Sequence, residues 1–328
     1  MKFWPCALIL SALLLGGWVA THPPARPPEP EWLGHYSGLN AQGRELEIVL
    51  SSSTDHPGGV EGRWRSGGEG TWEIGQGTVQ RSTITLFHEP GKPALTGRFQ
   101  EEPDGTRVLQ VGAARLVLVI THSTFRLEQP RAVVQCVHPR LIYPRPALRR
   151  AVEEARADAV EEARRVFREI GEDQDESVVY PWDYSETWNV SVCTDTVVSL
   201  FGYGSSYLGG AHGNTHFGTR TFWWRDGEVQ ELRLADLFSP CMPWQDVLTD
   251  LVTGQVRAAG ASAVADDSGS RLDERDLQNW TMTRRGIEFH FEPYRLGCYA
   301  EGAYYAFVKY EDIRELLNPV GPAAELLR

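Results

Sequence analysis

The sequence predicts an all-β N-terminal module (a small barrel or sandwich) followed by an α+β domain, in which two main helices pack an antiparallel sheet. Short alternating stretches separated by Gly-rich turns fill residues 31–126. Apolar residues then recur at three- and four-residue steps over Ala147–Ile170, which indicates one long amphipathic helix. Stretches rich in β-branched and aromatic residues return after Trp188. A length of 328 residues accommodates two such domains.

Composition and charge exclude several classes of protein. The chain is 41% hydrophobic and 23% charged, so it is neither wholly disordered nor a multi-span membrane protein. Lys and Arg number 32 against 44 Asp and Glu, and the net charge of −12 argues against a nucleic-acid partner. Eleven Trp and eleven Tyr leave room for an aromatic binding surface.

The N-terminus has the pattern of a secretory signal peptide. Lys2 is its only charge, and Phe3 to Ala20 is uncharged with a leucine-rich centre. We expect residues 1–20 to be removed and the protein to be exported to the periplasm, the cell envelope or the medium. The alternative to cleavage is that this segment stays as an N-terminal anchor, which is the only membrane contact we expect. Residues 21–30 are half proline and predict an extended linker.

Residues 31–126 form the predicted β-barrel-like module. Its pieces resemble a small β-barrel module of bacterial envelope proteins, which implies binding or packing more than catalysis. The matching pieces are Gly34–Gly38, Leu46–Leu50, Val60–Gly62, Leu86–Glu89 and Thr96–Phe99. The predicted strands are Glu45–Leu50, Val60–Trp64, Thr71–Ile74, Ser82–His88, Leu95–Phe99, Arg107–Val111 and Arg115–Ile120.

The second domain, residues 131–320, is predicted to mix strands with helices. Its helices are Ala147–Ile170, Trp244–Ala258 and a short terminal one at Glu311–Leu317, and Ala259–Arg271 is predicted as a loop. The Asp226-Gly227 turn predicts a hairpin. The predicted strands are Ala132–Val137, Trp188–Thr194, Thr196–Phe201, Thr219–Trp224, Val229–Leu232, Trp280–Thr283, Ile287–Phe291 and Tyr304–Lys309.

Three motifs in this domain keep a common order. They are Tyr207 to Gly213 with its Gly-Gly-Ala-His core, Leu234 to Phe238, and the stretch from Gly286 to Gly302 with its spaced Phe and Tyr residues. Together they resemble the RsiV/PdaC-type bacterial envelope domain of unknown function. The resemblance implies that the partner could be a lysozyme-type muramidase or another envelope component. The cysteines and a cytoplasmic sigma-binding segment are not part of the pattern, so no anti-sigma role is implied.

The candidate binding residues are Tyr203, Tyr207, His212 and Tyr299. Glycines flank the tyrosines, and Tyr and Trp side chains commonly anchor interfaces and stack on sugars. Around His212 the three glycines predict a shaped loop, which could be a structural turn, a binding loop or a catalytic or metal site. No third ligand joins His212 and His216, so we predict no metal site and no cofactor.

Four cysteines remain after the signal segment, and an even count in an exported chain favours disulfides. Spacing alone leaves three pairings open. We expect Cys136–Cys193, because both lie in strands flanking the long helix, and Cys241–Cys298, because that bond would fix the tyrosine-rich loop. Free thiols are the alternative, and the lack of a CxxC spacing disfavours zinc.

These observations favour an exported, non-catalytic binding protein. An acidic chain suits a basic partner, such as a lysozyme, through electrostatic steering, and a cell-wall component is the other option. An envelope hydrolase acting on peptidoglycan or its acyl groups is the alternative, since Ser199, Ser205 and Ser206 precede His212. However, Gly202 to Ser206 lacks the Gly-x-Ser-x-Gly spacing. A structural envelope protein is the third possibility.

Overall fold

The computed structural model describes residues 32–40, 42–52, 59–67, 72–89, 92–142, 145–172, 182–265 and 271–327. The predicted signal peptide and proline-rich linker, and part of the predicted loop Ala259–Arg271, lie outside these residues. Trp32–Arg328 forms one compact unit. In the part of the chain that is described, no helix combines the length and the apolar character that crossing a membrane requires.

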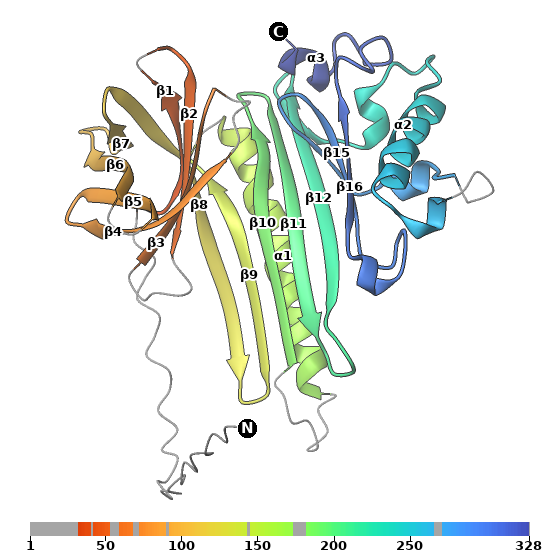
Figure 1. Ribbon diagram of the computed structural model, residues 1–328, viewed down its shortest axis with the longest axis horizontal. Helices are drawn as coiled ribbons and strands as arrows, with labels where there is room; N and C mark the ends of the chain where they lie inside the picture. The colour runs from red at the N-terminus through yellow and green to blue at the C-terminus, as the bar shows by residue number, and fades with distance from the viewer. Residues whose placement is uncertain are drawn as a thin grey trace, which may run out of the picture. The chain divides into compact units, whose positions relative to one another are not determined.

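The N-terminal all-β prediction is confirmed, and the structure is a barrel of eight antiparallel strands (Figure 1). Each strand pairs with the next, and β1 also pairs with β8, which closes the barrel. The predicted strand Thr71–Ile74 ends too early in the sequence, because β4 continues through a Gly-Gln-Gly stretch to Gln80. The strands are β1 (Gly34–Leu39), β2 (Glu45–Ser52), β3 (Gly59–Ser66), β4 (Glu73–Gln80), β5 (Thr83–Glu89), β6 (Lys92–Glu101), β7 (Arg107–Val111) and β8 (Ala114–Gln129).

The barrel interior is filled by the chain's own side chains. Leu46, Ile48 and Leu50 of β2 point inward as the alternation predicts, among fully buried residues of the other strands. The Tyr36 hydroxyl, also inside, donates to the Trp32 carbonyl at 2.8 Å. This packing leaves the outer face of the barrel strands as the surface that a ligand could reach.

The large sheet continues from the barrel into the second domain through β8. The second half of β8 pairs with β9, and β10 lies parallel to β9 (Figure 1). The prediction of a purely antiparallel sheet is therefore wrong here, because a helix connects β9 to β10 and such a crossover makes the two strands parallel. The elements are β9 (Ala132–Leu141), α1 (Pro146–Glu172), β10 (Trp182–Cys193), β11 (Val197–Tyr207), β12 (Asn214–Arg225) and β13 (Glu228–Glu231).

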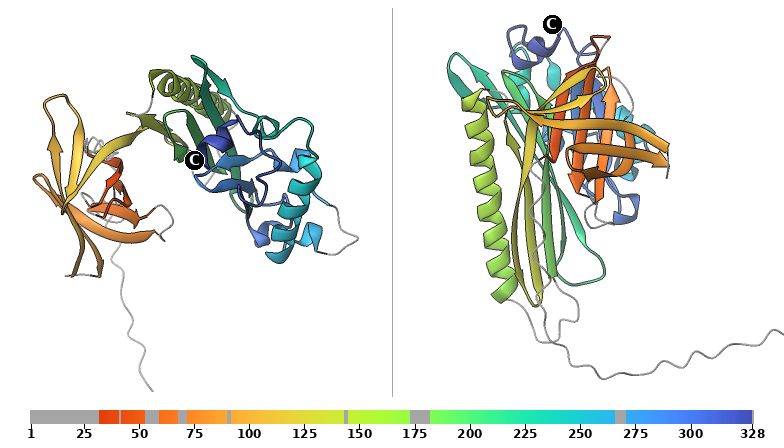
Figure 2. Two further views of the ribbon diagram at one scale, coloured as in Figure 1. Left: turned by 90° about the horizontal axis from the view of Figure 1, so that it is seen from above. Right: turned by 90° about the vertical axis from the view of Figure 1, so that its left-hand side faces the viewer.

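A second, three-stranded sheet follows, with strand order β14-β15-β16. The second domain therefore has four layers: α1, the large sheet, the small sheet and α2. Figure 2 shows α1 lying along one face of the large sheet. The elements of this part are η1 (Leu234–Leu237), α2 (Trp244–Ala258), η2 (Ser262–Val264), η3 (Glu274–Leu277), β14 (Trp280–Met282), β15 (Gly286–Phe291), η4 (Tyr299–Glu301), β16 (Tyr304–Lys309) and α3 (Pro322–Leu326).

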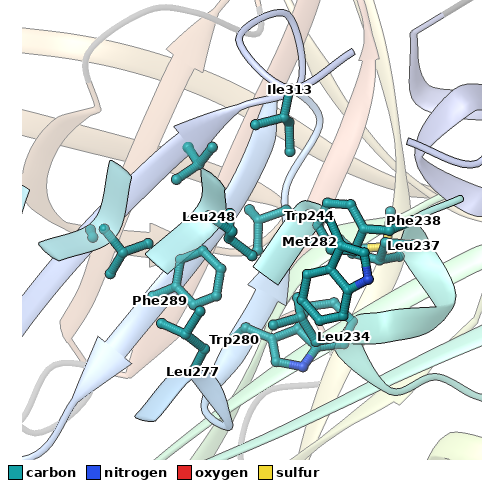
Figure 3. Packing of buried hydrophobic residues seen from close by; sticks show 14 of the residues in the cluster. Leu234, Leu237, Phe238, Trp244, Leu248, Leu277, Trp280, Met282, Phe289 and Ile313 are labelled. Atoms are coloured by element: carbon teal, nitrogen blue, oxygen red, sulfur yellow. The ribbon is translucent and has the colours of Figure 1, made fainter. Parts of the chain in front are cut away.

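Alternation along β11 separates the two cores on either side of the large sheet. Val198 and Leu200 belong to the core with α1, whereas Val197 belongs to the core that includes α2. In the second core, Phe238 and Trp244 stack with ring centroids 4.5 Å apart (Figure 3). The sequence had suggested that the two longer helices pack on one sheet. In the structure they pack on different sheets.

Hydroxyl groups of the large sheet join it to the edge of the small sheet. The Met282 amide of β14 donates to Ser199 Oγ at 3.0 Å, and the Trp280 amide donates to Thr219 Oγ1 at 3.3 Å. Ser199 is fully buried and also hydrogen-bonds the Thr221 hydroxyl at 2.7 Å. A buried amide without a partner is costly, so these hydroxyls stabilise the contact between the two sheets.

The predicted helix at Glu311–Leu317 is wrong. This segment forms turns, and Leu316 and Leu317 are buried. Leu317 bridges to Phe238, and the Ser239 amide donates to the Leu316 carbonyl at 2.9 Å. These tertiary contacts override the weak helix propensity of a short segment.

No disulfide joins the four described cysteines. Cys136–Cys193 is sterically impossible: Glu186 lies opposite Cys136, and Cys193 is seven residues further along β10, roughly 23 Å away at the strand rise. Cys241 and Cys298 are both exposed and are not bonded to each other. Burial raises the pKa of the Cys136 and Cys193 thiols to about 12, which makes both poor nucleophiles.

Candidate functional site

The candidate site forms where the β11–β12 hairpin tip meets the loop that follows β15. The tip contains Gly209 and Gly210, both with positive φ (89° and 97°), a conformation that favours glycine. The Tyr207 hydroxyl donates to the Gly210 carbonyl at 3.2 Å. Tyr207 therefore braces the tip that presents His212.

His212, Tyr294 and Tyr299 form a surface group that we call the histidine–tyrosine stack. The rings of His212 and Tyr299 lie nearly parallel with centroids 3.9 Å apart, and the ring of Tyr294 lies 5.5 Å from that of Tyr299. His212 Nδ1 lies 2.8 Å from the Gly213 carbonyl and donates to it, while Nε2 lies within hydrogen-bond distance of the Tyr294 hydroxyl, at 3.1 Å. Both ring nitrogens of His212 are thus engaged in holding the stack.

Tyr294 is in an unfavourable backbone conformation. Its φ is +73°, in the left-handed region that bulky residues avoid, and its side chain is 59% exposed. Tyr294 lies in a turn whose backbone conformation suits glycine, yet the position holds an exposed aromatic residue. Strained residues of this kind are concentrated at functional sites.

Glu301 fixes the short turn that carries Tyr299. Its carboxylate accepts hydrogen bonds from the Cys298 amide (3.0 Å), the Ser262 hydroxyl (2.8 Å) and the Tyr304 hydroxyl (2.8 Å). The Cys298 amide, followed by the other donors, lowers the pKa of Glu301 to about 2. The turn is held by this carboxylate and not by the predicted disulfide.

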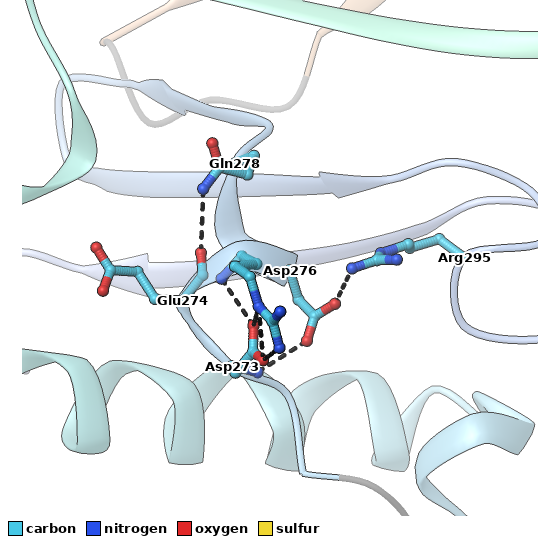
Figure 4. A network of polar contacts seen from close by, with 6 residues as sticks. Asp273, Glu274, Asp276, Gln278 and Arg295 are labelled. Carbon is cyan, nitrogen blue, oxygen red and sulfur yellow. Dashed lines mark hydrogen bonds and ion pairs between the residues drawn. The ribbon is translucent and has the colours of Figure 1, made fainter.

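Arg295 fixes the other side of the loop. It forms an ion pair with Asp276, whose carboxylate also accepts from the Asp273 amide at 2.8 Å (Figure 4). Asp276 belongs to η3, so the residue next to Tyr294 is connected to a structured element. Hydrogen bonds and ion pairs therefore hold Tyr294 and Tyr299 from both sides.

Two further exposed tyrosines flank Phe217, one from β11 of the large sheet and one from β16 of the small sheet. Tyr203 is 45% and Tyr305 is 49% exposed, and their ring centroids lie 5.9 and 6.1 Å from that of buried Phe217. The Phe217 amide donates to Glu292 at 2.7 Å, at the start of the loop that carries Tyr294. Burial, followed by the nearby Tyr203 and Glu288, raises the pKa of Tyr305. We call Tyr203 and Tyr305 the tyrosine pair.

His290 lies beneath the tyrosine pair and serves packing. Its ring stacks on Phe201 at 4.1 Å, and its Nε2 lies 3.0 Å from Thr281 Oγ1. Burial lowers the pKa of His290 to about 4, so the imidazole is neutral at pH 7. This buried histidine was not singled out from the sequence.

Two of the three serines considered for hydrolysis have other partners. Ser199 is committed to Met282 and Thr221, and Ser205 Oγ lies 2.9 Å from Ser185 Oγ. Both nitrogens of His212 are occupied by Gly213 and Tyr294. Across the described ranges, no cluster of three His, Cys, Asp or Glu side chains could hold a metal ion.

The structure divides the four predicted binding residues among three roles. His212 and Tyr299 meet in the stack, Tyr203 belongs to the tyrosine pair, and Tyr207 braces the hairpin tip. From the sequence, Tyr294 and Tyr305 belong to the wider aromatic set of this domain, but they were not chosen as interface residues. Both lie in the tyrosine-rich motif, but the backbone conformation that distinguishes Tyr294 leaves no signal in residue type.

Comparison with known proteins finds similarity, over part of the chain, to a family whose function is unknown. The sequence model of a family described as "Protein of unknown function (DUF3298)" matches residues 235–311. A solved DUF3298 family structure from Bacteroides fragilis is 17% identical over 63% of this chain and 97% of its own, with a TM-score of 0.41. Another, from Pseudomonas aeruginosa, is 14% identical over 61% and 93%, with a TM-score of 0.45. No curated protein matches. Residues 235–311 thus have the sequence pattern of a DUF3298 domain. This segment contains Tyr294 and Tyr299 and begins after the hairpin that carries His212.

Proposed function

We propose that this chain is an exported cell-envelope protein that binds a partner protein through the histidine–tyrosine stack without catalysing a reaction. The observation that carries the proposal is Tyr294, which is exposed, strained and bonded to His212. The strain is maintained by contacts from two loops, and the ring still faces solvent. A partner protein that covers the ring explains why the strained, exposed conformation is kept, since Tyr is among the residues that dominate binding interfaces.

The tyrosine pair enlarges this surface. Tyr203, Tyr294, Tyr305 and Leu208 are all more than two-fifths exposed, and all four come from the β11–β12 hairpin or from the chain between β15 and the middle of β16. Exposed apolar groups concentrated in this way are typical of interaction sites, whereas isolated ones are not. The engagement of His212, Ser199 and Ser205 in structural hydrogen bonds supports a binding role without catalysis.

The proposed partner is a basic protein of the lysozyme type. The chain carries a net charge of −12, which favours encounter with a basic protein. The resemblance to the RsiV/PdaC-type envelope domain supports the same choice. Export, suggested by the N-terminal segment, would bring the chain into contact with such a partner.

Biolayer interferometry with immobilised chain and soluble lysozyme tests the proposal. We expect saturable binding at low ionic strength that weakens as salt is added. Tyr294→Gly should abolish binding, because it removes the ring and tolerates the backbone conformation. The matched control is Ile74→Ser, which removes an exposed apolar side chain (62%) from the barrel.

Each outcome bears on one part of the proposal. Loss of binding in Tyr294→Gly together with retention in Ile74→Ser supports the surface. Equal binding by wild type and Tyr294→Gly excludes the stack as the interface, and no binding of wild type at low salt excludes a lysozyme. Release of acyl groups or sugar fragments from peptidoglycan by the chain, lost in His212→Ala, would indicate the hydrolase instead.

A further inference from the structure

A cavity of about 750 Å³ lies against the outer face of the barrel, apart from the histidine–tyrosine stack. One wall consists of residues on β1, β2 and β3, and the other of residues on β10, β11 and the β14–β15 turn. Its size is in the range of small-molecule sites. We call it the arginine cavity, after Arg63, Arg65, Arg284 and Arg285 in its lining.

The lining is basic in a chain that is acidic. Its four arginines face only two carboxylates, Glu47 and Glu288, whereas acidic residues outnumber basic ones 44 to 32 in the whole chain. Burial raises the pKa of Glu288, which favours its uncharged form. The charge balance of the lining is therefore opposite to that of the chain as a whole.

The barrel wall of the cavity holds Arg65 in a fixed position. Glu47, 6% exposed, forms an ion pair with Arg65, and its other oxygen lies 3.5 Å from His35 Nε2. Burial alone would raise the pKa of Glu47, but hydrogen bonds and charge from His35 and Arg65 lower it to about 2. The Arg65 guanidinium also lies 4.6 Å from the ring centroid of Trp72. An arginine held between a carboxylate and an indole is pre-organised to present its remaining N–H groups.

Arg63 adds a second positive charge that the described residues do not neutralise. It lies two residues before Arg65 on β3, so both side chains point to the same face of the strand. Arg63 makes no ion pair with another described residue. Across the cavity, Arg284 is already paired with Glu45 at 3.0 Å. The cation with unused capacity is therefore Arg63, beside the fixed Arg65.

The rest of the lining mixes apolar side chains with polar ones such as His35, His122 and Asn189. Trp72, Phe201 and Phe307 contribute aromatic surface, and valine and isoleucine side chains of β8 and β10 complete it. A cavity that combines arginine side chains with aromatic rings matches a molecule with a charged head and an apolar body.

We propose that the arginine cavity binds a small amphiphilic anion, with its carboxylate or phosphate head at Arg63 and Arg65 and its apolar body against Trp72, Phe201 and Phe307. The head exchanges its hydration for charge-assisted hydrogen bonds from two guanidinium groups. The proposal does not depend on the proposed partner protein, because no residue of the histidine–tyrosine stack lines this cavity.

Isothermal titration calorimetry on the purified full chain tests the proposal with four probes: octanoate, octyl phosphate, 1-octanol and inorganic phosphate. We expect octanoate, octyl phosphate or both to bind once per chain. Octanol and inorganic phosphate should each bind at least about tenfold more weakly, because each lacks one half of the recognised molecule. The preferred head group then identifies the class of natural ligand as a carboxylate or a phosphate.

Two arginine variants locate the site. Arg63→Gln should weaken binding of the preferred probe by about tenfold, the effect of losing roughly one charge-assisted hydrogen bond. Arg98→Gln, which removes an exposed arginine of β6 outside the cavity, should leave the affinity unchanged. Equal weakening by both variants would show a general charge effect and overturn the site.

Three other results would also overturn the proposal. One is no binding of either amphiphile up to about 5 mM, where the binding free energy is only about 3 kcal/mol. The second is octanol binding as tightly as octanoate and octyl phosphate, which would show a merely apolar cavity. The third is full affinity in Arg63→Gln.

Discussion

Replacing Tyr294 by glycine and by alanine separates the backbone strain of this residue from its side-chain contacts. Both variants lose the same interactions, namely the hydrogen bond to His212 and the ring contact with Tyr299. Their difference in stability therefore reports the cost of a left-handed residue. A residue with a Cβ loses about 1–2 kcal/mol of folding stability in the left-handed conformation. Glycine avoids this cost but loses about 0.4–1 kcal/mol of folding stability, because its unfolded chain has more conformational freedom.

Tyr294→Gly should thus be more stable than Tyr294→Ala by about 0.5–1 kcal/mol. Urea unfolding followed by tryptophan fluorescence measures this directly, and an m-value of about 3 kcal/mol/M makes the shift in midpoint about 0.2–0.3 M. The same pair of substitutions at Ile74, exposed on strand β4, should give the opposite order. Alanine as stable as glycine at position 294 would refute the strain, and with it the main argument for the site.

Three further substitutions test other parts of the structure. Ser199→Ala should cost about 1–3 kcal/mol in urea unfolding, because the buried Met282 amide loses its acceptor, while Ser51→Ala on the surface should change stability by less than about 0.5 kcal/mol. The pKa of Glu47 is about 2 in the folded chain, below the value of about 4.3 in the unfolded chain. The contribution of Glu47 to folding stability is therefore present above the unfolded value and is lost as the pH falls from about 5 to 2. Unfolding midpoints across this range should fall less steeply in Glu47→Gln. His290 has a pKa of about 4 when folded, so the unfolded chain takes up a proton first and stability falls by about 3 kcal/mol between roughly pH 6.5 and 4. His290→Phe should reduce that fall in the same assay, and an unchanged pH profile would contradict the burial of the imidazole.

Local elements could be predicted from the sequence where periodicity and flanking residues agree. The helix Trp244–Ala258 and the strands Arg107–Val111 and Tyr304–Lys309 have the predicted bounds. In β16 the alternating pattern also matches the burial that the strand acquires. In α2, however, Val247 and Leu251 were expected to face inward and are exposed. The barrel was predicted as a class for the same reason, since every strand alternates between an inner and an outer face.

Features that depend on distant parts of the chain could not be predicted. The parallel pairing of β9 with β10 follows from the route of the chain around α1, and that pairing separates Cys136 from Cys193. The residue pattern of Glu311–Leu317 is compatible with a helix, but contacts with the chain around Phe238 determine its turns. The stack was half predicted, because glycines marked the loops of His212 and Tyr299 while nothing marked the strain at Tyr294.

The stack and the arginine cavity can be tested independently because they share no residue. Tyr294→Gly alters a loop held by Arg295 and Glu301, neither of which lines the cavity, so octanoate or octyl phosphate should bind this variant with unchanged affinity. Conversely, Arg63→Gln lies on the barrel and should leave lysozyme binding intact apart from a small long-range charge effect. If either substitution abolishes both activities, the two sites are coupled through the fold, and the assignment of each activity to its own residues fails.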